Sequence, residues 1–126
     1  MRPGGEFDTI SLALDRWDKD KKNDEKNRDA IIEIEDSGAY TEKIKIALDG
    51  GDRLELRAAN GKRPIIRLLD WKLNQPDSLK VEGRGKSGDP GRLTLDGLLI
   101  TGRGVTVTGD LTEVKIRHCT LVPGWS

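Results

Sequence analysis

The chain contains 126 residues, of which 34% are apolar and 35% are charged, and its 22 basic side chains balance its 22 acidic ones. This length fits one domain, and the lack of net charge disfavours nucleic acid and an acidic membrane surface as partners. The small apolar fraction predicts a thin core of the kind found in stacked repeats. No apolar run approaches the roughly 18 residues needed to cross a bilayer. The single cysteine, Cys119, excludes an internal disulfide framework.

The first expected element is a short amphipathic helix within residues 8–17. Its apolar residues recur at helical spacing, at positions 10, 13, 14 and 17, and Asp8 or Thr9 can cap its N-terminus. Residues 18–29 contain no apolar residue and carry charges of both signs. This composition predicts a solvated, mobile loop.

From Ala30 onward the pattern changes to short strands in which apolar residues alternate with polar ones, as in Leu54-Glu55-Leu56. Turn-forming residues separate these runs, among them Asn60-Gly61, Gly102 and Gly109. No second helix is expected, so parallel strands cannot be joined by crossover helices. The strands therefore form either an antiparallel sandwich or a coil in which strands are connected through other strands.

Two apolar series favour the coil. The first runs through positions 34, 56, 81, 100 and 121, in steps of 22, 25, 19 and 21 residues. The second runs through positions 46, 68, 95 and 116, in steps of 22, 27 and 21 residues, and its longest step spans a Gly-rich loop at 83–91. A nearly constant period indicates a solenoid whose rungs stack on one another. The antiparallel sandwich is kept as the alternative.

The expected organisation is one β-helix domain over residues 1–126, belonging to a longer protein. Residues 8–17 form a helix that covers the open first rung, residues 18–29 form the charged loop, and residues 30–122 form the rungs. Side chains that point into the coil or from the helix onto it should be buried: Ile10, Leu14, Ile34, Ile46, Leu56, Leu68, Val81, Leu95, Ile100 and Ile116.

Three segments carry a family resemblance. They are Thr-Ile-Ser-Leu-Ala-Leu at 9–14, Gly-Ala-Tyr-Thr-Glu at 38–42, and the strand-turn-strand pattern at 54–66. They resemble the capping helix, the turn after the first strand, and the next rung of pectin-lyase-like proteins, pectin methylesterases included. The resemblance implies an all-β fold, a right-handed parallel β-helix with a short N-terminal capping α-helix. Catalytic residues of the esterases lie in later rungs, so no catalytic or cofactor-binding residue is assigned.

Calcium is the metal that the resemblance suggests, because pectate-lyase relatives bind it through carboxylates. The aspartates that could serve are Asp36, Asp49, Asp52 and Asp70. Each lies beside Gly, Ser or a strand end, where an Asp side chain bonds its own backbone in a turn. We therefore interpret all four as turn residues and expect no metal.

Other chemically suggestive residues have simpler interpretations. Arg117-His118-Cys119 brings an imidazole next to a thiol, but adjacent strand residues point to opposite faces, so they cannot act together. His118 is expected to face outward and Cys119 to be buried. The segment 83–88 lacks the spacing of a phosphate loop, and Trp17, Trp71 and Trp125 are too scattered for a sugar-stacking platform.

The expected function is a non-catalytic structural or carbohydrate-facing module of a larger protein. Outward strand positions form stripes of mixed charge that could bind a polysaccharide, with a merely solvated face as the alternative: Glu33, Glu35, Lys45, Glu55, Arg57, Arg67, Lys80, Glu82, Lys115 and Arg117. The alternative function is the N-terminal part of a polysaccharide lyase, esterase or hydrolase whose active site lies beyond this chain.

A homodimer is also expected, joined through the C-terminal rung. A helix covers the first rung, but no segment after Leu121 is available to cover the last one. Residues 114–122 should then lie at the interface, with Cys119 near it. In the alternative, residues 123–125 fold back as a makeshift cap and the chain is monomeric.

Overall fold

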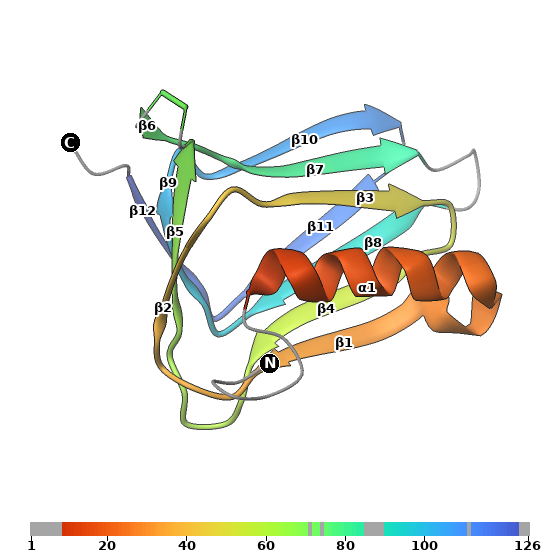
Figure 1. Ribbon diagram of the computed structural model, residues 1–126, viewed down its shortest axis with the longest axis horizontal. Coiled ribbons are helices and arrows are strands. Elements are labelled where there is room, and N and C mark those ends of the chain that lie inside the picture. The colour runs from red at the N-terminus through yellow and green to blue at the C-terminus, as the bar shows by residue number, and fades with distance from the viewer. Residues whose placement is uncertain (1–8, 71, 74, 85–89, 111, 124–126) are drawn as a thin grey trace.

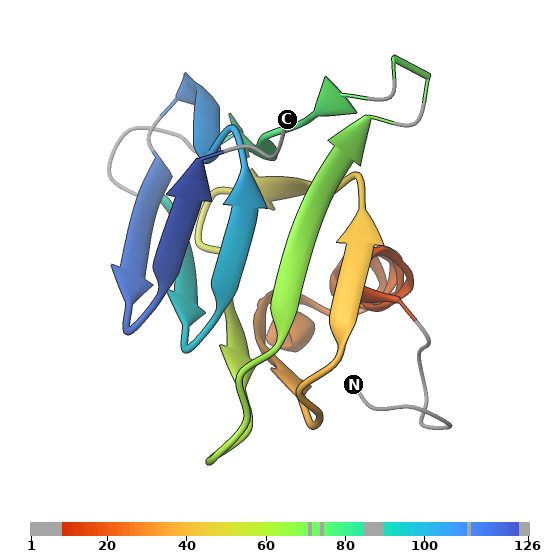
Figure 2. The same ribbon diagram turned by 90° about the vertical axis from the view of Figure 1, so that its left-hand side faces the viewer.

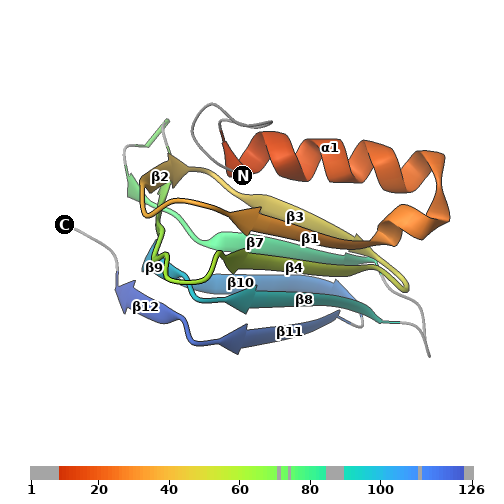
Figure 3. The ribbon, with the colours of Figure 1, turned by 90° about the horizontal axis from the view of Figure 1, so that it is seen from below.

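The chain folds into a parallel β-helix with an α-helix across one end, as the sequence predicts (Figure 1). The computed structural model describes residues 9–70, 72–73, 75–84, 90–110 and 112–123. The strands form three parallel sheets, and the coil winds right-handed from the helical end (Figures 1 and 3). The antiparallel sandwich is therefore wrong. Among the described residues, antiparallel pairing is confined to the short β5–β6 contact.

The elements follow one another as short strands after two helical segments. They are α1 (Ile10–Asn23), the 3-10 helix η1 (Glu25–Arg28), β1 (Asp29–Ile34), β2 (Ala39–Glu42), β3 (Lys45–Asp49), β4 (Arg53–Ala58), β5 (Ile65–Asp70), β6 (Gln75–Pro76), β7 (Leu79–Arg84), β8 (Gly91–Asp96), β9 (Leu99–Gly102), β10 (Val105–Asp110), β11 (Thr112–Arg117) and β12 (Thr120–Pro123).

Each complete rung contributes one strand to each sheet. Sheet A has the order β1-β4-β8-β11, sheet B the order β12-β9-β5-β2, and sheet C the order β10-β7-β3. Figure 2 shows sheet B with its strands running in one direction. The chain thus passes through sheets A, B and C in turn, and its fourth rung consists of β11 and β12.

The two apolar series of the sequence do not follow these stacks. Ile46 lies beside Val81 in sheet C, and Leu56 lies beside Leu95 in sheet A. Of the predicted steps, only 95 to 116 and 100 to 121 join residues in register. The series mixed residues of different sheets because every strand carries the same alternation. The second rung is also longer than the others, since it includes β6 and the segment between β7 and β8.

Inward-facing side chains of successive rungs stack to form the core. Ile66 and Ile100 are neighbours in sheet B, and both are almost fully buried. Burial of an aliphatic side chain of this size stabilises the fold by about 1.5–3 kcal/mol. Nine of the ten residues predicted to be buried are buried: Ile10, Leu14, Ile34, Ile46, Leu56, Leu68, Val81, Leu95 and Ile100.

The tenth, Ile116, is wrong as a buried residue, because its side chain is 41% exposed. It stacks on the buried Leu95 and points into the coil, but β11 is the last strand of sheet A. The sequence therefore predicted correctly that the Ile116 side chain points into the coil, but a further rung is needed to bury it.

Helix α1 covers the first rung, as predicted (Figure 3). Thr9 is its N-cap and accepts a hydrogen bond from the Leu12 amide at 3.1 Å. Ile10, Leu14 and Trp17 are buried in the common core. The N-terminus of the helix is held by Glu42, which accepts the Ile10 and Ser11 amides at 2.9 Å each. Glu42 ends the Gly-Ala-Tyr-Thr-Glu segment, so that segment anchors the cap.

The predicted loop at 18–29 is wrong. The helix continues to Asn23, η1 follows, and β1 already begins at Asp29. Opposite charges four residues apart, Arg16 with Asp20 and Lys22 with Asp18, support the added turns. The buried Lys21 then fixes this part of the helix to the coil.

Candidate functional site

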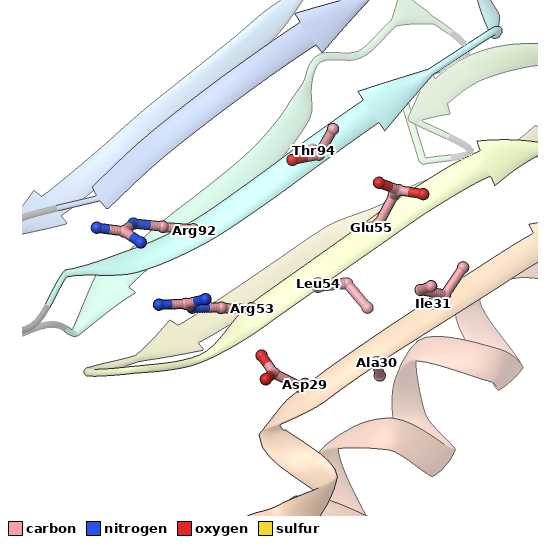
Figure 4. A pocket seen from close by; sticks show the side chains of 8 residues that line it. All are labelled: Asp29, Ala30, Ile31, Arg53, Leu54, Glu55, Arg92 and Thr94. Atoms are coloured by element: carbon pink, nitrogen blue, oxygen red, sulfur yellow. The ribbon is translucent and has the colours of Figure 1, made fainter.

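A shallow pocket lies on the outer face of sheet A, across β1, β4 and β8 (Figure 4). Outer-face residues occupy alternate positions of each strand and stack in register from rung to rung. The residues that line the pocket are Asp29, Ala30, Ile31, Arg53, Leu54, Glu55, Arg92 and Thr94.

Two arginines stand side by side in this pocket. The outward row at the start of the strands reads Asp29, Arg53, Arg92 and Glu113, one residue from each strand of sheet A. Figure 4 shows the guanidinium groups of Arg53 and Arg92 extending toward the same end of the sheet, with the Asp29 carboxylate beside them. Like charges opposite each other on neighbouring strands destabilise a sheet.

The two arginines differ in their partners. Arg92 Nε lies 3.0 Å from Glu113 Oε2. Among the described residues, Arg53 has no ion pair or side-chain hydrogen bond, and Asp29 lies outside ion-pair distance of it although the two are in register. The Arg53 guanidinium is therefore available to an anion from solution, and that anion would also reduce its repulsion with Arg92.

A further outward arginine of sheet A, Arg57, is already paired. Arg57 Nε lies 3.0 Å from Glu33 Oε2, and Arg57 Nη1 lies 3.1 Å from Glu55 Oε2. The hydrogen bonds to Glu33 and Glu55 raise the pKa of Arg57. Because both carboxylates already engage this guanidinium, Arg57 offers less to an external anion than Arg53 does.

A second charged cluster lies under the helix and is structural. Lys21 Nζ is 2.7 Å from Asp52 Oδ2 and 3.4 Å from Asp49 Oδ2, and it lies 4.1 Å from the centre of the Trp17 ring. The side chains of Lys21 and Asp52 are 2% and 0% exposed. Asp18, at 3.5 Å, completes the cluster. This ion pair joins the helix to the turn between the first two rungs.

Asp18 shows the electrostatic effect of this arrangement. Partial burial opposes ionisation of its carboxyl group, but the hydrogen bond from Lys22 and the charge of Lys21 outweigh it. The pKa of Asp18 is lowered as a result.

The four aspartates considered for calcium do not gather at one site, since Asp49 and Asp52 both contact Lys21, whereas Asp36 and Asp70 serve separate turns. Asp36 accepts the Gly38 amide at 2.7 Å and Asp70 accepts the Lys72 amide at 3.0 Å, which confirms the turn interpretation for both. Asp52 also serves a turn, by accepting the Asp49 amide at 2.8 Å, but the sequence did not predict its pairing with Lys21. Within the described part of the chain, no group of three or more His, Cys, Asp or Glu side chains could hold a metal ion.

Tyr40 extends the Asp36 turn. Its hydroxyl donates to Asp36 Oδ2 at 2.7 Å. Burial, together with this hydrogen bond, raises the pKa of the Tyr40 phenol.

His118 does not lie on a strand, so the predicted alternation does not apply to it. It occupies the bend between β11 and β12, with a φ of 53°, and it is exposed. Cys119 is partly buried rather than fully buried, and its sulfur lies 3.5 Å from the Leu98 amide that donates to it. Neither residue joins a cluster of reactive side chains among the described residues.

The remaining predictions divide between described and undescribed residues. Trp17 is a core residue, whereas Trp71 and Trp125 lie outside the described residues, as does most of the predicted loop at 83–91.

Of the outward charges, Lys45 pairs with Glu82 at 3.1 Å on sheet C. Those on sheet A are Glu33, Glu55, Arg57, Lys115 and Arg117.

The sequence analysis missed Asp29, Arg53, Arg92 and Thr94. Arg53 and Arg92 lie at or near strand starts and share the alternation of Glu55 and Thr94, so periodicity could have marked them as outward-facing. Periodicity alone could not have placed them side by side, because that depends on which strands pair.

In comparisons with known proteins, no protein-family model, curated protein or solved structure matched this chain. The described residues include no helix that is both long enough and apolar enough to span a membrane.

Proposed function

We propose that this chain is a non-catalytic β-helix module that binds a carboxylate-bearing polysaccharide on the outer face of sheet A. The observation that carries the proposal is the in-register pair Arg53 and Arg92, of which Arg53 has no ionic partner among the described residues. A guanidinium binds a carboxylate through two parallel hydrogen bonds, which favours an acidic glycan over a neutral one.

The shape of the face suits an extended polymer. Successive strands of a sheet lie about 4.8 Å apart, so outward side chains recur at short, regular spacing along the coil. Beside the arginines, Thr94 offers a hydroxyl group, and Ile31, which is 57% exposed, offers an apolar surface to a sugar ring. The resemblance to pectin-lyase-like proteins, whose substrates include acidic polysaccharides, supports the same class of ligand.

Calorimetric titration with galacturonate oligomers tests the proposal. Neutral glucose oligomers of equal length serve as the ligand control. The Arg53→Gln and Arg92→Gln variants should each bind about tenfold or more weakly, because each loses a charged hydrogen-bonding partner. Arg103→Gln, which removes an exposed arginine between β9 and β10, should bind like the parent. Affinity should also fall as salt is added.

Three results would contradict the proposal. They are the absence of binding by the parent, equal binding of the neutral oligomers, and unchanged affinity of the Arg53→Gln variant. Release of new chain ends from polygalacturonate by the purified chain would overturn its non-catalytic part.

A further inference from the structure

The end of the coil opposite α1 exposes side chains that point into the core. Val107, Ile116 and Leu121 are 46%, 41% and 45% exposed. Their neighbours in the preceding rung, Val81, Leu95 and Ile100, are almost fully buried and face the same way. The exposed residues are thus core residues that no further rung covers within the described part of the chain.

Among the described residues, no strand pairs with the outer edge of β11, which ends the order of sheet A. The Arg117 carbonyl accepts the Gly97 amide at 3.0 Å, so Arg117 directs its backbone groups toward β8. Backbone direction alternates along a strand, which places the donors and acceptors of Val114 and Ile116 on the opposite, outer edge. Such an edge pairs readily with another strand.

The outward charges of β11 are complementary to those of a second copy of β11 that runs antiparallel to it. Glu113 and Lys115 lie on either side of Val114. If two copies of β11 pair antiparallel with Val114 opposite Val114, each Glu113 lies opposite the Lys115 of the second copy. The same register brings the outer-edge backbone groups of the two Val114 residues together, as a hydrogen-bonded antiparallel pair requires.

We propose that the open end is a homodimer interface, formed by antiparallel pairing of β11 with its copy about a two-fold axis at Val114. The contact covers the exposed apolar end and satisfies the free edge. It closes at two copies because each uses the same surface, and α1 blocks the other end of each coil against further stacking. This proposal does not depend on polysaccharide binding, and its test uses no ligand.

Sedimentation equilibrium over a concentration series tests the interface. The parent should approach twice its 14.0 kDa mass. Lys115→Glu and Glu113→Lys each place like charges opposite one another and should weaken the dimer about tenfold. The double variant Glu113→Lys/Lys115→Glu restores opposite pairs and should recover dimerisation. Glu113 also pairs with Arg92, but both side chains are exposed, so the loss of that pair should have little effect on folding.

An apolar substitution supplies the second arm. Leu121→Lys should favour the monomer, whereas Leu12→Lys, which changes an exposed leucine on α1, should leave the dimer intact. A parent that is monomeric at all concentrations would overturn the proposal. So would a dimer indifferent to both single charge changes, or one that the double variant fails to restore.

Discussion

The ion pair between Lys21 and Asp52 should be a main determinant of how firmly the helix is held to the coil. Lys21→Met removes the cation and leaves Asp52, which is fully buried, beside Asp49 without its main neutralising partner. One oxygen of Asp52, Oδ1, already has no hydrogen-bond partner among the residues that the structure describes. Removing one partner of a buried ion pair costs about 3–5 kcal/mol. We therefore expect Lys21→Met to lower the free energy of unfolding by that amount, measured by urea denaturation followed by circular dichroism.

Two further variants separate charge from packing. Lys21→Met/Asp52→Asn removes both charges and keeps an acceptor for the Asp49 amide, so it should recover at least half of the loss. Lys22→Met, on the same helix, removes an exposed ion pair with Asp18 and should cost less than about 1 kcal/mol. A Lys21→Met variant within about 1 kcal/mol of the parent would refute the reasoning, because losses that small are typical of exposed ion pairs.

Two other predictions concern the start of the coil. Glu42→Gln weakens the acceptors for the Ile10 and Ser11 amides and should lower the free energy of unfolding by about 1–3 kcal/mol in urea denaturation. Glu82→Gln, which changes an exposed ion pair, should lower it by less than about 1 kcal/mol, and equal losses for the two variants would contradict this prediction. Folding raises the pKa of Tyr40 above its ordinary value of 10.0, so the unfolded chain loses this proton first as the pH rises. The stability contributed by Tyr40 is therefore present below about pH 10 and is lost as the pH rises toward the pKa of the folded state. Tyr40 is the sole tyrosine, so its absorbance reports its ionisation directly, and titration at pH 10 in the folded protein would contradict the prediction.

The sequence determined the local elements of this protein. Apolar alternation marked the strands and the side chains that face inward, because that pattern depends only on neighbouring residues. The start of the helix was also local, since Thr9 caps it and the apolar residues that follow recur at helical spacing. Its end was not, because residues 18–23 are all polar, and this part of the helix is held to the coil by the buried contact of Lys21 with Asp52, 31 residues away.

Only the tertiary structure decided which strands pair. All strands share one period, so the sequence could not distinguish sheets A, B and C, and it therefore predicted stacks that mix them. Gly109 shows the same limit: it was interpreted as a turn residue but lies within β10, in register with Gly83 of β7. The row that joins Arg53 to Arg92 spans 39 residues of sequence and exists because β4 pairs with β8. Strand pairing is set by how the whole chain coils, and so the candidate binding face appeared only with the fold.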